Sequence, residues 1–232
     1  IHQVRELERV RGLPPKELRL VGIGYLDAMK ARLERDGRTA SDGTLTVMMA
    51  PSWGKSGILS RYGERAIRAL LDTGSRVIIR PHPQYVRLYG DRIEGLIARY
   101  QDRIGEDFIV QTDFSSTDTV YSADLLVTDW SNVGFEFALS TLKPVLYINT
   151  PMKIMNPEYD RIDVVPFDIR IRAQLGGELE LSELDQAGAM AEKLLENPEA
   201  YREIIKGVKE REIYNLGRGA EAAGRYLVRR IE

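Results

Sequence analysis

Two nearby stretches decide the fold. The first is Leu125-Leu126-Val127-Thr128-Asp129-Trp130-Ser131-Asn132-Val133-Gly134-Phe135-Glu136-Phe137-Ala138, and the second is Lys-Pro-Val-Leu-Tyr-Ile-Asn at 143–149. An apolar run ends in Thr-Asp, a Ser-Asn pair opens a short helix, and a Lys-Pro step leads into a second apolar run. The pattern predicts strand, polar turn, helix and strand. The turn then lies at the end of a buried strand and the start of a helix, where α/β proteins bind phosphates and nucleotides.

The same alternation extends over most of the chain. Strands are predicted at 19–24, 44–50, 76–79, 108–110, 125–128 and 143–148. Helices are predicted between them at 25–36, 58–71, 85–100 and 119–123. Continuous apolar runs suit strands buried on both faces, so we expect an α/β fold with a doubly wound, Rossmann-like parallel sheet. Residues 149–177 read as irregular, and helices starting at Ser182, Pro198 and Gly217 make a helical tail over 182–232.

Composition limits the classes of function. The 232 residues are 43% hydrophobic and 29% charged, which predicts a buried core in a soluble chain. A net charge of −2 removes a global attraction to nucleic acid or to an anionic membrane. The chain has no cysteine, so disulfides, thiolate catalysis and cysteine metal sites are excluded. We expect a cytoplasmic protein, with any contact to the inner face of the membrane made by other parts of the full protein.

The N-terminal residues predict a boundary. Residues 1–18 are charged and contain Gly-Leu-Pro-Pro at 12–15, which indicates a linker or the end of a preceding domain. Residues 19–232 then form the nucleotide-binding domain. The first residues include neither an initiator methionine nor a signal-peptide core, so we expect the chain to be part of a longer protein.

Polar residues follow each predicted strand. Because the carboxyl ends of parallel strands meet at one edge of a sheet, we expect these residues to lie together. They are rich in hydrogen-bond donors and include cations and a histidine, a composition that suits a nucleoside diphosphate. The residues are Ser52 and Lys55 after 44–50, Arg80 and His82 after 76–79, Gln111, Thr112 and Asp113 after 108–110, and Asp129, Ser131 and Asn132 after 125–128.

The turn after residue 128 has two interpretations. If Ser131 and Asn132 start the helix, the amides of Asn132, Val133 and Gly134 are free to bind an anion, and Gly134 permits close approach. Alternatively, Ser131 only caps the helix. Glu136, on the same helix, either accepts both hydroxyls of a ribose or faces solvent.

His82 is one of two histidines and lies between two prolines that restrict its backbone. It is a candidate general acid or base, and a structural hydrogen bond is the other interpretation. Arg80 beside it either depresses its pKa or holds a phosphate. Lys55 is either a phosphate ligand or a solvated loop lysine, and we expect Trp53 and Trp130 to be packing residues.

Motifs of several other sites are absent. No Walker loop occurs, and Gly22-Ile23-Gly24 lacks the third glycine of a dinucleotide fingerprint. Two histidines cannot build a three-histidine metal site, and no metal ligands occur at diagnostic spacing. The sequence therefore predicts no cofactor and leaves a metal requirement open.

Four segments, read in order, resemble the CDP-glycerol glycerophosphotransferases, the teichoic-acid polymerases and primases of bacterial envelope synthesis. The resemblance covers roughly residues 19–150. It implies the nucleotide-binding C-terminal half of a GT-B-like transferase. Such enzymes move glycerol phosphate, or a related polyol phosphate, from a CDP donor to a polyol-phosphate or sugar-lipid acceptor and release CMP. The segments are Ala50-Pro51-Ser52-Trp53, Arg80-Pro81-His82-Pro83, Thr128-Asp129-Trp130-Ser131-Asn132 with Phe135-Glu136, and Lys143-Pro144-Val145-Leu146.

The resemblance also implies roles for single residues. The family's His-Pro histidine falls on His82, which is expected to assist at the transferred phosphate. Its Asp-x-Ser-Ser turn falls on Asp129, Ser131 and Asn132, which are expected to cradle the donor phosphates. Its following acidic residue falls on Glu136, which is expected near the ribose.

By the same resemblance, Gln111–Asp113 are expected near the base, but the chain departs from the family in three places. Asn132 replaces the second serine of the turn, and Gly54 precedes Lys55 where a basic residue usually follows the tryptophan. No His-Gly dipeptide occurs, although that element supplies a second catalytic histidine in the family. We therefore expect an N-terminal domain outside this chain.

Two other functions are alternatives to this transferase. One is a GT-B-like glycosyltransferase or nucleotide-sugar 2-epimerase using a UDP-sugar, and the other is a non-catalytic nucleotide-binding domain.

Overall fold

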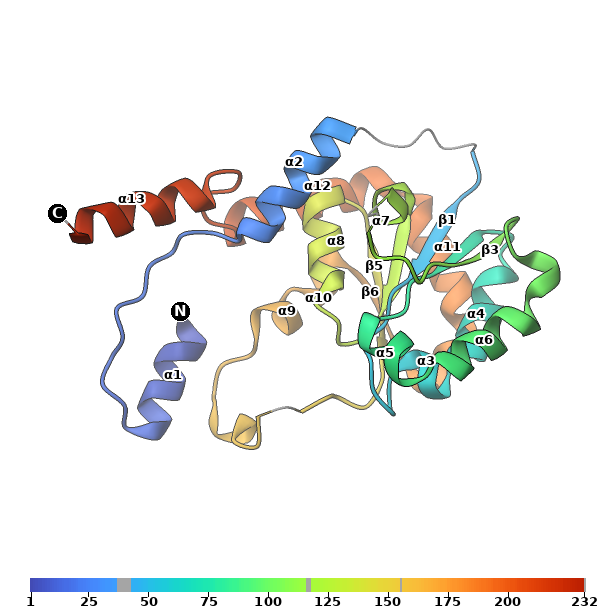
Figure 1. Ribbon diagram of the computed structural model, residues 1–232, viewed down its shortest axis with the longest axis horizontal. Coiled ribbons are helices and arrows are strands. Elements are labelled where there is room, and N and C mark those ends of the chain that lie inside the picture. Colours follow the sequence, from blue (N-terminus) through green and yellow to red (C-terminus); the bar gives the residue numbers. More distant parts are fainter. Residues whose placement is uncertain (37–42, 116–117, 155, 232) are drawn as a thin grey trace.

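The computed structural model describes residues 1–36, 43–115, 118–154 and 156–231. Within these ranges, parallel strands form one six-stranded sheet in the order β3-β2-β1-β4-β5-β6, with helices against both faces (Figure 1). The predicted doubly wound α/β fold is therefore confirmed. The strands are β1 Thr46–Met49, β2 Arg76–Ile79, β3 Phe108–Val110, β4 Leu125–Thr128, β5 Val145–Asn149 and β6 Gly176–Glu180.

The order of the strands reverses next to β1. The chain runs outward from β1 through β2 to β3, and then returns to place β4 on the other side of β1, where Val47 pairs with Leu125. At such a reversal the loops after two neighbouring strands turn in opposite directions and leave a crevice at their carboxyl ends. The crevice here lies between the loop that follows β1 and the turn that follows β4.

Helices cover the two faces of the sheet with separate apolar cores. Helices α2, α8 and α12 contribute Leu26, Phe137 and Ile205 to one core, and α4 and α11 contribute Ile67 and Leu194 to the other. The helices are α1 His2–Arg11, α2 Gly24–Asp36, α3 Ile58–Arg61, α4 Gly63–Leu71, α5 Pro83–Leu88, α6 Gly90–Arg99, α7 Asp118–Ser122, α8 Val133–Thr141, α9 Phe167–Arg170, α10 Arg172–Leu175, α11 Ala187–Glu196, α12 Pro198–Glu212 and α13 Gly219–Ile231. Short 3-10 helices lie at Gln101–Arg103, Tyr159–Arg161 and Leu181–Gln186.

The strand predicted at 19–24 is wrong. Residues 12–23 form no regular structure, and helix α2 begins at Gly24. Gly22 has a φ of +104°, and an added Cβ would lie 2.5 Å from the carbonyl oxygen of Tyr214. The apolar run therefore packs against the connection between α12 and α13, where Asn215 donates to the carbonyl of Leu20 (3.2 Å).

Strand β6 lies inside the region predicted to be irregular. Among the described strands it pairs with β5 alone. Leu179 is its one buried residue, because two acidic residues and two glycines break the apolar pattern. Gly176 is required because an added Cβ would lie 1.9 Å from the carbonyl oxygen of Val145. The predicted helix start at Ser182 is also wrong, since a 3-10 helix begins at Leu181 with Glu180 and Glu183 as a capping box.

Two predicted helices are divided. The helix expected at 58–71 breaks at Tyr62 into α3 and α4, and the helix expected at 85–100 breaks at Tyr89 into α5 and α6. Neither aromatic residue has helical backbone angles: Tyr62 has a φ of −127° and Tyr89 a φ of −137°. The second break turns the Tyr89 ring toward Tyr85, with 4.9 Å between the ring centroids.

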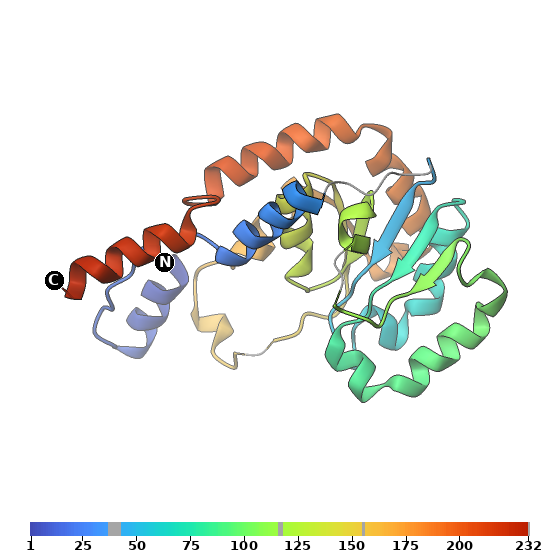
Figure 2. The same ribbon diagram turned by 45° about the horizontal axis from the view of Figure 1, so that its top comes forward.

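The N-terminal residues, expected to be a linker or the end of a preceding domain over 1–18, include helix α1. Arg11 pairs with Glu158 and Arg161 donates to the carbonyl of Val10, so α1 is joined to the segment after β5. Both termini lie at the end of the molecule away from β3 (Figures 1 and 2). The division at residue 18 stays a prediction. No helix in the described ranges is long and apolar enough to cross a membrane.

Candidate functional site

Asp129 joins the two sides of the crevice. Its side chain is buried, with 1% of the residue exposed, and one carboxylate oxygen accepts from the amide of Ser52 at 2.7 Å. The other oxygen accepts from the amide of Ile58 at 3.4 Å. Both oxygens are therefore occupied by backbone donors, and their charge would repel a phosphate. Asp129 therefore shapes the loop 51–57, and its expected role in cradling the donor phosphates stays a prediction.

The turn that follows Asp129 presents fewer free amides than expected. Helix α8 has Asn132 as its N-cap, not Ser131, and the Asn132 side chain makes no capping bond. The amide of Gly134 donates to the carbonyl of Ser131 at 3.2 Å, so it is not one of the free amides expected at this turn. No described residue accepts from the amides of Asn132 and Val133. These two amides are therefore available to bind an anion at the start of α8.

Gly134 has a packing role. A Cβ at this position would lie 2.7 Å from the ring of Tyr147, which is 3% exposed. The glycine therefore admits the tyrosine ring, and the expected close approach belongs to β5 rather than to a ligand. Ser131 is half-buried and Asn132 is exposed, so both remain accessible at the crevice.

Arg172 is a buried cation behind the turn. It is 3% exposed, and its guanidinium carbon lies 4.2 Å from the ring centroid of Trp130 and 4.5 Å from that of Tyr147. It donates to Asn149 at 2.9 Å, and its nearest carboxylate oxygen, on Glu178, is 3.8 Å away. Burial lowers the pKa of Arg172. Its Nε and the Tyr147 hydroxyl have no hydrogen-bond partner among the described residues.

Arg172 was not predicted to belong to the site. It lies in the segment without periodicity after β5, and no local motif marks it. The fold returns this segment to the carboxyl edge of the sheet, where Arg172 joins Asp129, Trp130 and Ser131 around a small cavity of about 10 Å³. A positive charge at this depth raises the electrostatic potential of the turn in front of it.

His82 uses one ring nitrogen to cap α5. Its Nδ1 accepts from the amide of Gln84 at 3.0 Å, so the neutral ring carries its proton on Nε2. Burial, and then the charge of Lys153, lower the pKa of His82. Arg80 was expected either to depress this pKa or to hold a phosphate, and the cation that lowers the pKa of His82 is Lys153. His82 is therefore neutral near pH 7 and offers an N–H donor.

Trp53 and Lys153 complete the surroundings of His82. The rings of Trp53 and His82 are 6.3 Å apart, and the Lys153 ammonium lies 3.6 Å from the Trp53 ring centroid. Lys153 also donates to the carbonyl of Trp53 at 3.3 Å. Like Arg172, Lys153 comes from the segment after β5, and sequence reasoning missed it.

The loop 51–57 lines a cavity of about 170 Å³ beside this cluster. Gly54 has a φ of +132°, a conformation that favours glycine, and its carbonyl accepts from the Ser60 hydroxyl at 2.6 Å. Trp53 and Trp130 were expected to be packing residues, but both are half-buried and line the cavity. Its polar lining side chains include Ser52, Lys55, Ser56 and Lys153.

Arg80 belongs to a second group of polar residues. Its Nη1 donates to Gln111 at 2.5 Å and to Thr119 at 3.4 Å, and its guanidinium carbon lies 5.4 Å from the ring centroid of Phe114. Thr119 also donates to Gln111. Burial lowers the pKa of Arg80.

The loop after β3 is organised by its own side chains. The Asp113 carboxylate accepts from the amide and the hydroxyl of Ser115 at 2.9 and 3.0 Å, and these bonds lower the pKa of Asp113. Thr112 and Asp113 are exposed, whereas Gln111 is half-buried and holds Arg80. Of the three residues predicted here, Gln111 therefore points inward and Asp113 fixes the turn.

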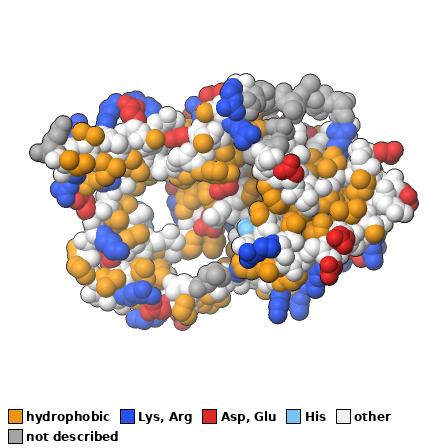
Figure 3. Space-filling model, viewed as in Figure 1, with side chains coloured by type: hydrophobic (Ala, Val, Ile, Leu, Met, Phe, Trp, Pro, Cys, Tyr) orange, Lys and Arg blue, Asp and Glu red, His pale blue; other side chains and the backbone are white. Residues whose placement is uncertain are grey.

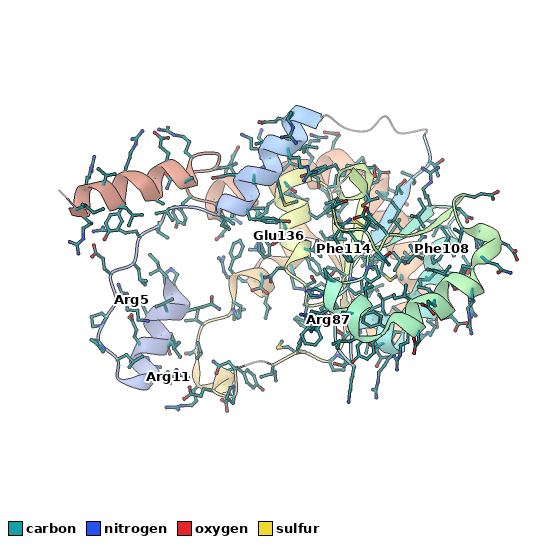
Figure 4. The ribbon with its side chains drawn as sticks, in the orientation of Figure 1. Arg5, Arg11, Arg87, Phe108, Phe114 and Glu136 are labelled. Atoms are coloured by element: carbon teal, nitrogen blue, oxygen red, sulfur yellow. The ribbon has the colours of Figure 1, made fainter. Side chains whose placement is uncertain are left out.

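Glu136 is half-buried on α8, and burial raises its pKa. Its charge also raises the pKa of Tyr25 on α2, after the larger effect of burial, while Arg80 acts on Tyr25 in the opposite direction. Glu136 and Phe114, both labelled in Figure 4, therefore share one neighbourhood with Arg80. A partly buried carboxylate in such surroundings is suited to accept hydrogen bonds from ligand hydroxyls.

The family of the chain can be assigned by comparison with known proteins. A family model described as CDP-glycerol:poly(glycerophosphate) glycerophosphotransferase matches residues 26–160, more than half of the chain. The chain belongs to this family. The resemblance drawn from the four sequence segments is thus confirmed, and the matched range includes His82, Asp129 and Glu136.

Three solved structures are similar to the chain at low sequence identity. A protein assigned as UDP-N-acetylglucosamine 2-epimerase from Listeria monocytogenes is 17% identical over 97% of this chain, with a TM-score of 0.56. The wall teichoic acid polymerase TagF is 17% identical over 90% of this chain, and MurG from Acinetobacter baumannii 13% over 90%, each with a TM-score of 0.49. The chain spans 56%, 47% and 56% of these three proteins, in that order. No curated protein sequence matched the chain.

Proposed function

We propose that this domain binds the CDP-activated donor of a polyol-phosphate transferase. The reaction moves glycerol phosphate, or a related polyol phosphate, to an envelope-polymer acceptor and releases CMP. Membership of the glycerophosphotransferase family carries the proposal, because the family match contains every strand end that contributes to the crevice. The chemistry of the crevice supports it.

The pyrophosphate of the donor would occupy the turn after β4. The free amides of Asn132 and Val133 and the hydroxyl of Ser131 are donors for its oxygens, and Arg172 provides a buried positive charge behind them. Lys55 and Lys153 would approach from the loop 51–57 and from the segment after β5. Phosphoryl transfer depends mainly on positioning and charge stabilisation, and these residues supply both.

The nucleoside would extend toward α8 and the loop after β3. Glu136 would accept the ribose hydroxyls, and Gln111 with Arg80 would face the base. Cytosine offers a carbonyl oxygen and an unprotonated ring nitrogen to such donors. Thr112 and Asp113 would border the base from the exposed side of the loop.

His82 would act as a hydrogen-bond donor at the reacting phosphate. In the reaction an acceptor hydroxyl attacks the phosphorus that carries the polyol, and the bond from that phosphorus to the bridging oxygen of CMP breaks. Nε2–H of His82 would stabilise the negative charge that develops on the departing CMP. Because Nδ1 is engaged by Gln84, His82 is poorly suited to accept the proton of the attacking hydroxyl. We assign that base to a part of the protein outside residues 1–232.

Calorimetric titration of the purified chain tests the proposal. CDP-glycerol should bind more tightly than UDP-N-acetylglucosamine and GDP-mannose, and His82→Gln should leave binding of CDP itself nearly unchanged. Glu192→Gln on α11, an exposed residue away from the crevice, is the matched control. Tighter binding of the UDP-sugar than of every cytidine ligand would overturn the proposal.

The second candidate is an enzyme that uses a UDP-sugar, which the fold shared with the Listeria monocytogenes protein favours. Product analysis with the full-length protein separates the two, since release of CMP supports the first and UDP or an epimerised sugar supports the second. A full-length His82→Ala variant with unchanged turnover would remove His82 from the mechanism and favour a non-catalytic domain.

A further inference from the structure

A second polar cavity lies where the loop 51–57 meets α3 and the junction of α5 and α6. It measures about 260 Å³ and is lined by Lys55, Ser60, Arg61, Tyr89 and Arg92. Its lining has three cationic side chains and no carboxylate. Lys55 also lines the cavity of about 170 Å³ described above, so the two cavities meet at this residue. Figure 3 shows Lys and Arg atoms projecting from the edge of the molecule beside α3 and α5.

The three cations differ from their neighbours in having no acidic partner. Arg65 pairs with Asp185 at 2.7 Å and Arg68 with Glu64 at 3.1 Å on the adjoining helix α4. In the described part of the chain, Lys55, Arg61 and Arg92 form no ion pair. Like charges gathered without a counter-charge repel one another, and binding of an anion removes that repulsion.

The cavity is partly preorganised. Arg92 donates from Nη1 to the carbonyl of Ser60 at 2.8 Å, and its guanidinium carbon lies 5.4 Å from the Tyr89 ring centroid. The Tyr89 ring in turn packs 4.9 Å from that of Tyr85, which is 2% exposed. The other N–H groups of Arg92 have no acceptor among the described residues, so an anion would meet donors already in place, at a reduced entropic cost.

We propose that the cavity formed by Lys55, Arg61 and Arg92 binds a phosphate group of the acceptor substrate. The proposal rests on the donor-binding function proposed for the neighbouring cavity. Guanidinium groups bind phosphate oxygens through paired N–H donors, and lysine adds a point charge. The cavity meets the donor cavity at Lys55, so a phosphate bound in it lies beside the donor. A polyol-phosphate acceptor carries phosphates along its chain behind the reacting hydroxyl. Such an acceptor can place that hydroxyl at the donor and one of its phosphates in this cavity at the same time.

The test uses the purified chain of residues 1–232 and a fluorescently labelled synthetic trimer of glycerol phosphate, followed by anisotropy. The pocket variant is Arg61→Gln/Arg92→Gln. The control is Arg65→Gln/Arg68→Gln, which removes the same charge from arginines that are already paired. We expect the pocket variant to bind the trimer about tenfold more weakly, the effect of two exposed charge-assisted contacts. The control should change the affinity by less than about twofold, the range for exposed pairs.

Binding of CDP by the same variants separates this proposal from the donor function. If CDP binding is retained and the trimer binds equally well to the wild type and the pocket variant, the acceptor site is overturned and the donor function stands. Absence of trimer binding by the wild type, or equal weakening in both double variants, also overturns it. Failure of the wild type to bind CDP counts against the donor function, whereas loss of trimer binding in the pocket variant alone still supports the phosphate site. Inorganic phosphate should compete poorly with the trimer for the chain. If phosphate displaces the trimer at a concentration equal to that of the trimer, the assignment of the cavity to an acceptor chain is overturned.

Discussion

The two sides of the proposed donor site, one at the turn after β4 and the other at the loop after β3, differ in how far their polar groups are already paired. Beside the turn after β4, the amides of Asn132 and Val133, the Nε of Arg172 and the Tyr147 hydroxyl have no hydrogen-bond partner among the described residues. Beside the loop after β3, Arg80, Gln111 and Thr119 bond to one another. We call these the phosphate side and the base side.

The difference has an energetic consequence. A ligand on the phosphate side gains hydrogen bonds to groups that have none, whereas a ligand on the base side must exchange bonds that already exist. A net gain of about 1 kcal/mol is usual for an exchanged bond, and an unpaired buried group costs about as much again until a ligand satisfies it. We therefore expect most of the affinity for CDP to come from the phosphate side.

Replacement of Arg172 should have the largest effect. Arg172→Met keeps the contacts with Trp130 and Tyr147 but removes the buried charge, so CDP should bind about 30-fold more weakly, the loss of about 2 kcal/mol expected for a charge-assisted contact. Calorimetric titration with CDP measures the change. The control is Arg170→Met, an exposed arginine paired with Glu212. A change of less than about threefold for Arg172→Met would contradict the asymmetry.

Asp129→Asn should act on the phosphate side through the loop 51–57. An amide group would face the backbone donors of Ser52 and Ile58, so one of them would lose its acceptor at a cost of about 2 kcal/mol in unfolding free energy. CDP binding should weaken about tenfold because the loop that carries Ser52 and Lys55 loses one of its two bonds to residue 129. Denaturant unfolding and titration measure the two effects, with Asp185→Asn on the exposed surface as control. Normal stability combined with normal binding would show that the carboxylate does not support the loop.

Glu136→Gln tests the base side through the ribose. A neutral amide accepts hydrogen bonds less strongly than a carboxylate, so CDP should bind about fivefold more weakly. Because 2′-deoxy-CDP offers only the 3′-hydroxyl to Glu136, the substitution should weaken its binding less than it weakens the binding of CDP. Glu192→Gln is the control, and an equal loss for both nucleotides would show that Glu136 does not contact the 2′-hydroxyl.

Titration of His82 should make the stability of the fold depend on pH. Its folded-state pKa is lowered, so the unfolded state takes up a proton first as pH falls below about 6.5. The contribution of neutral His82 to stability is therefore fully present above that pH and is lost below it. Between pH 7.5 and 5.5 the wild type should lose more stability than His82→Gln, measured by denaturant unfolding at each pH. Lys153→Gln should reduce the difference, and an identical pH profile for wild type and His82→Gln would rule out this titration.

The elements that could be predicted from the sequence are the strands buried on both faces of the sheet, and the elements that were missed lack their apolar pattern. Strands β1, β2, β4 and β5 are buried on both faces, and their apolar runs made them and the residues after them predictable. His82 and Asp129 could be placed at the sheet edge for this reason. The edge strand β6 lacks such a run and was missed.

Arg172 and Lys153 were missed for a different reason. Both lie in the segment after β5, which has no strand or helix period, so only the path of the chain brings them to the crevice. Sequence reasoning also overcounted the free amides at α8. The bond from Gly134 to Ser131 depends on the pitch of the first turn, which residue types do not determine.

Gln111→Ala should have the smallest effect and tests the asymmetry most directly. The substitution removes the acceptor shared by Arg80 and Thr119, and leaves Arg80 bonded to Thr119 at 3.4 Å. A bond to the base is lost, but the ligand no longer competes with the internal bond, so CDP affinity should change by less than about threefold. Titration with CDP and with inorganic pyrophosphate measures both sides, since pyrophosphate should bind Gln111→Ala and the wild type alike. Gln111→Ala could instead weaken CDP binding as much as Arg172→Met does. In that case the loss of internal hydrogen bonds on the base side does not cancel the gain of hydrogen bonds to the ligand, and the nucleoside rather than the pyrophosphate dominates recognition.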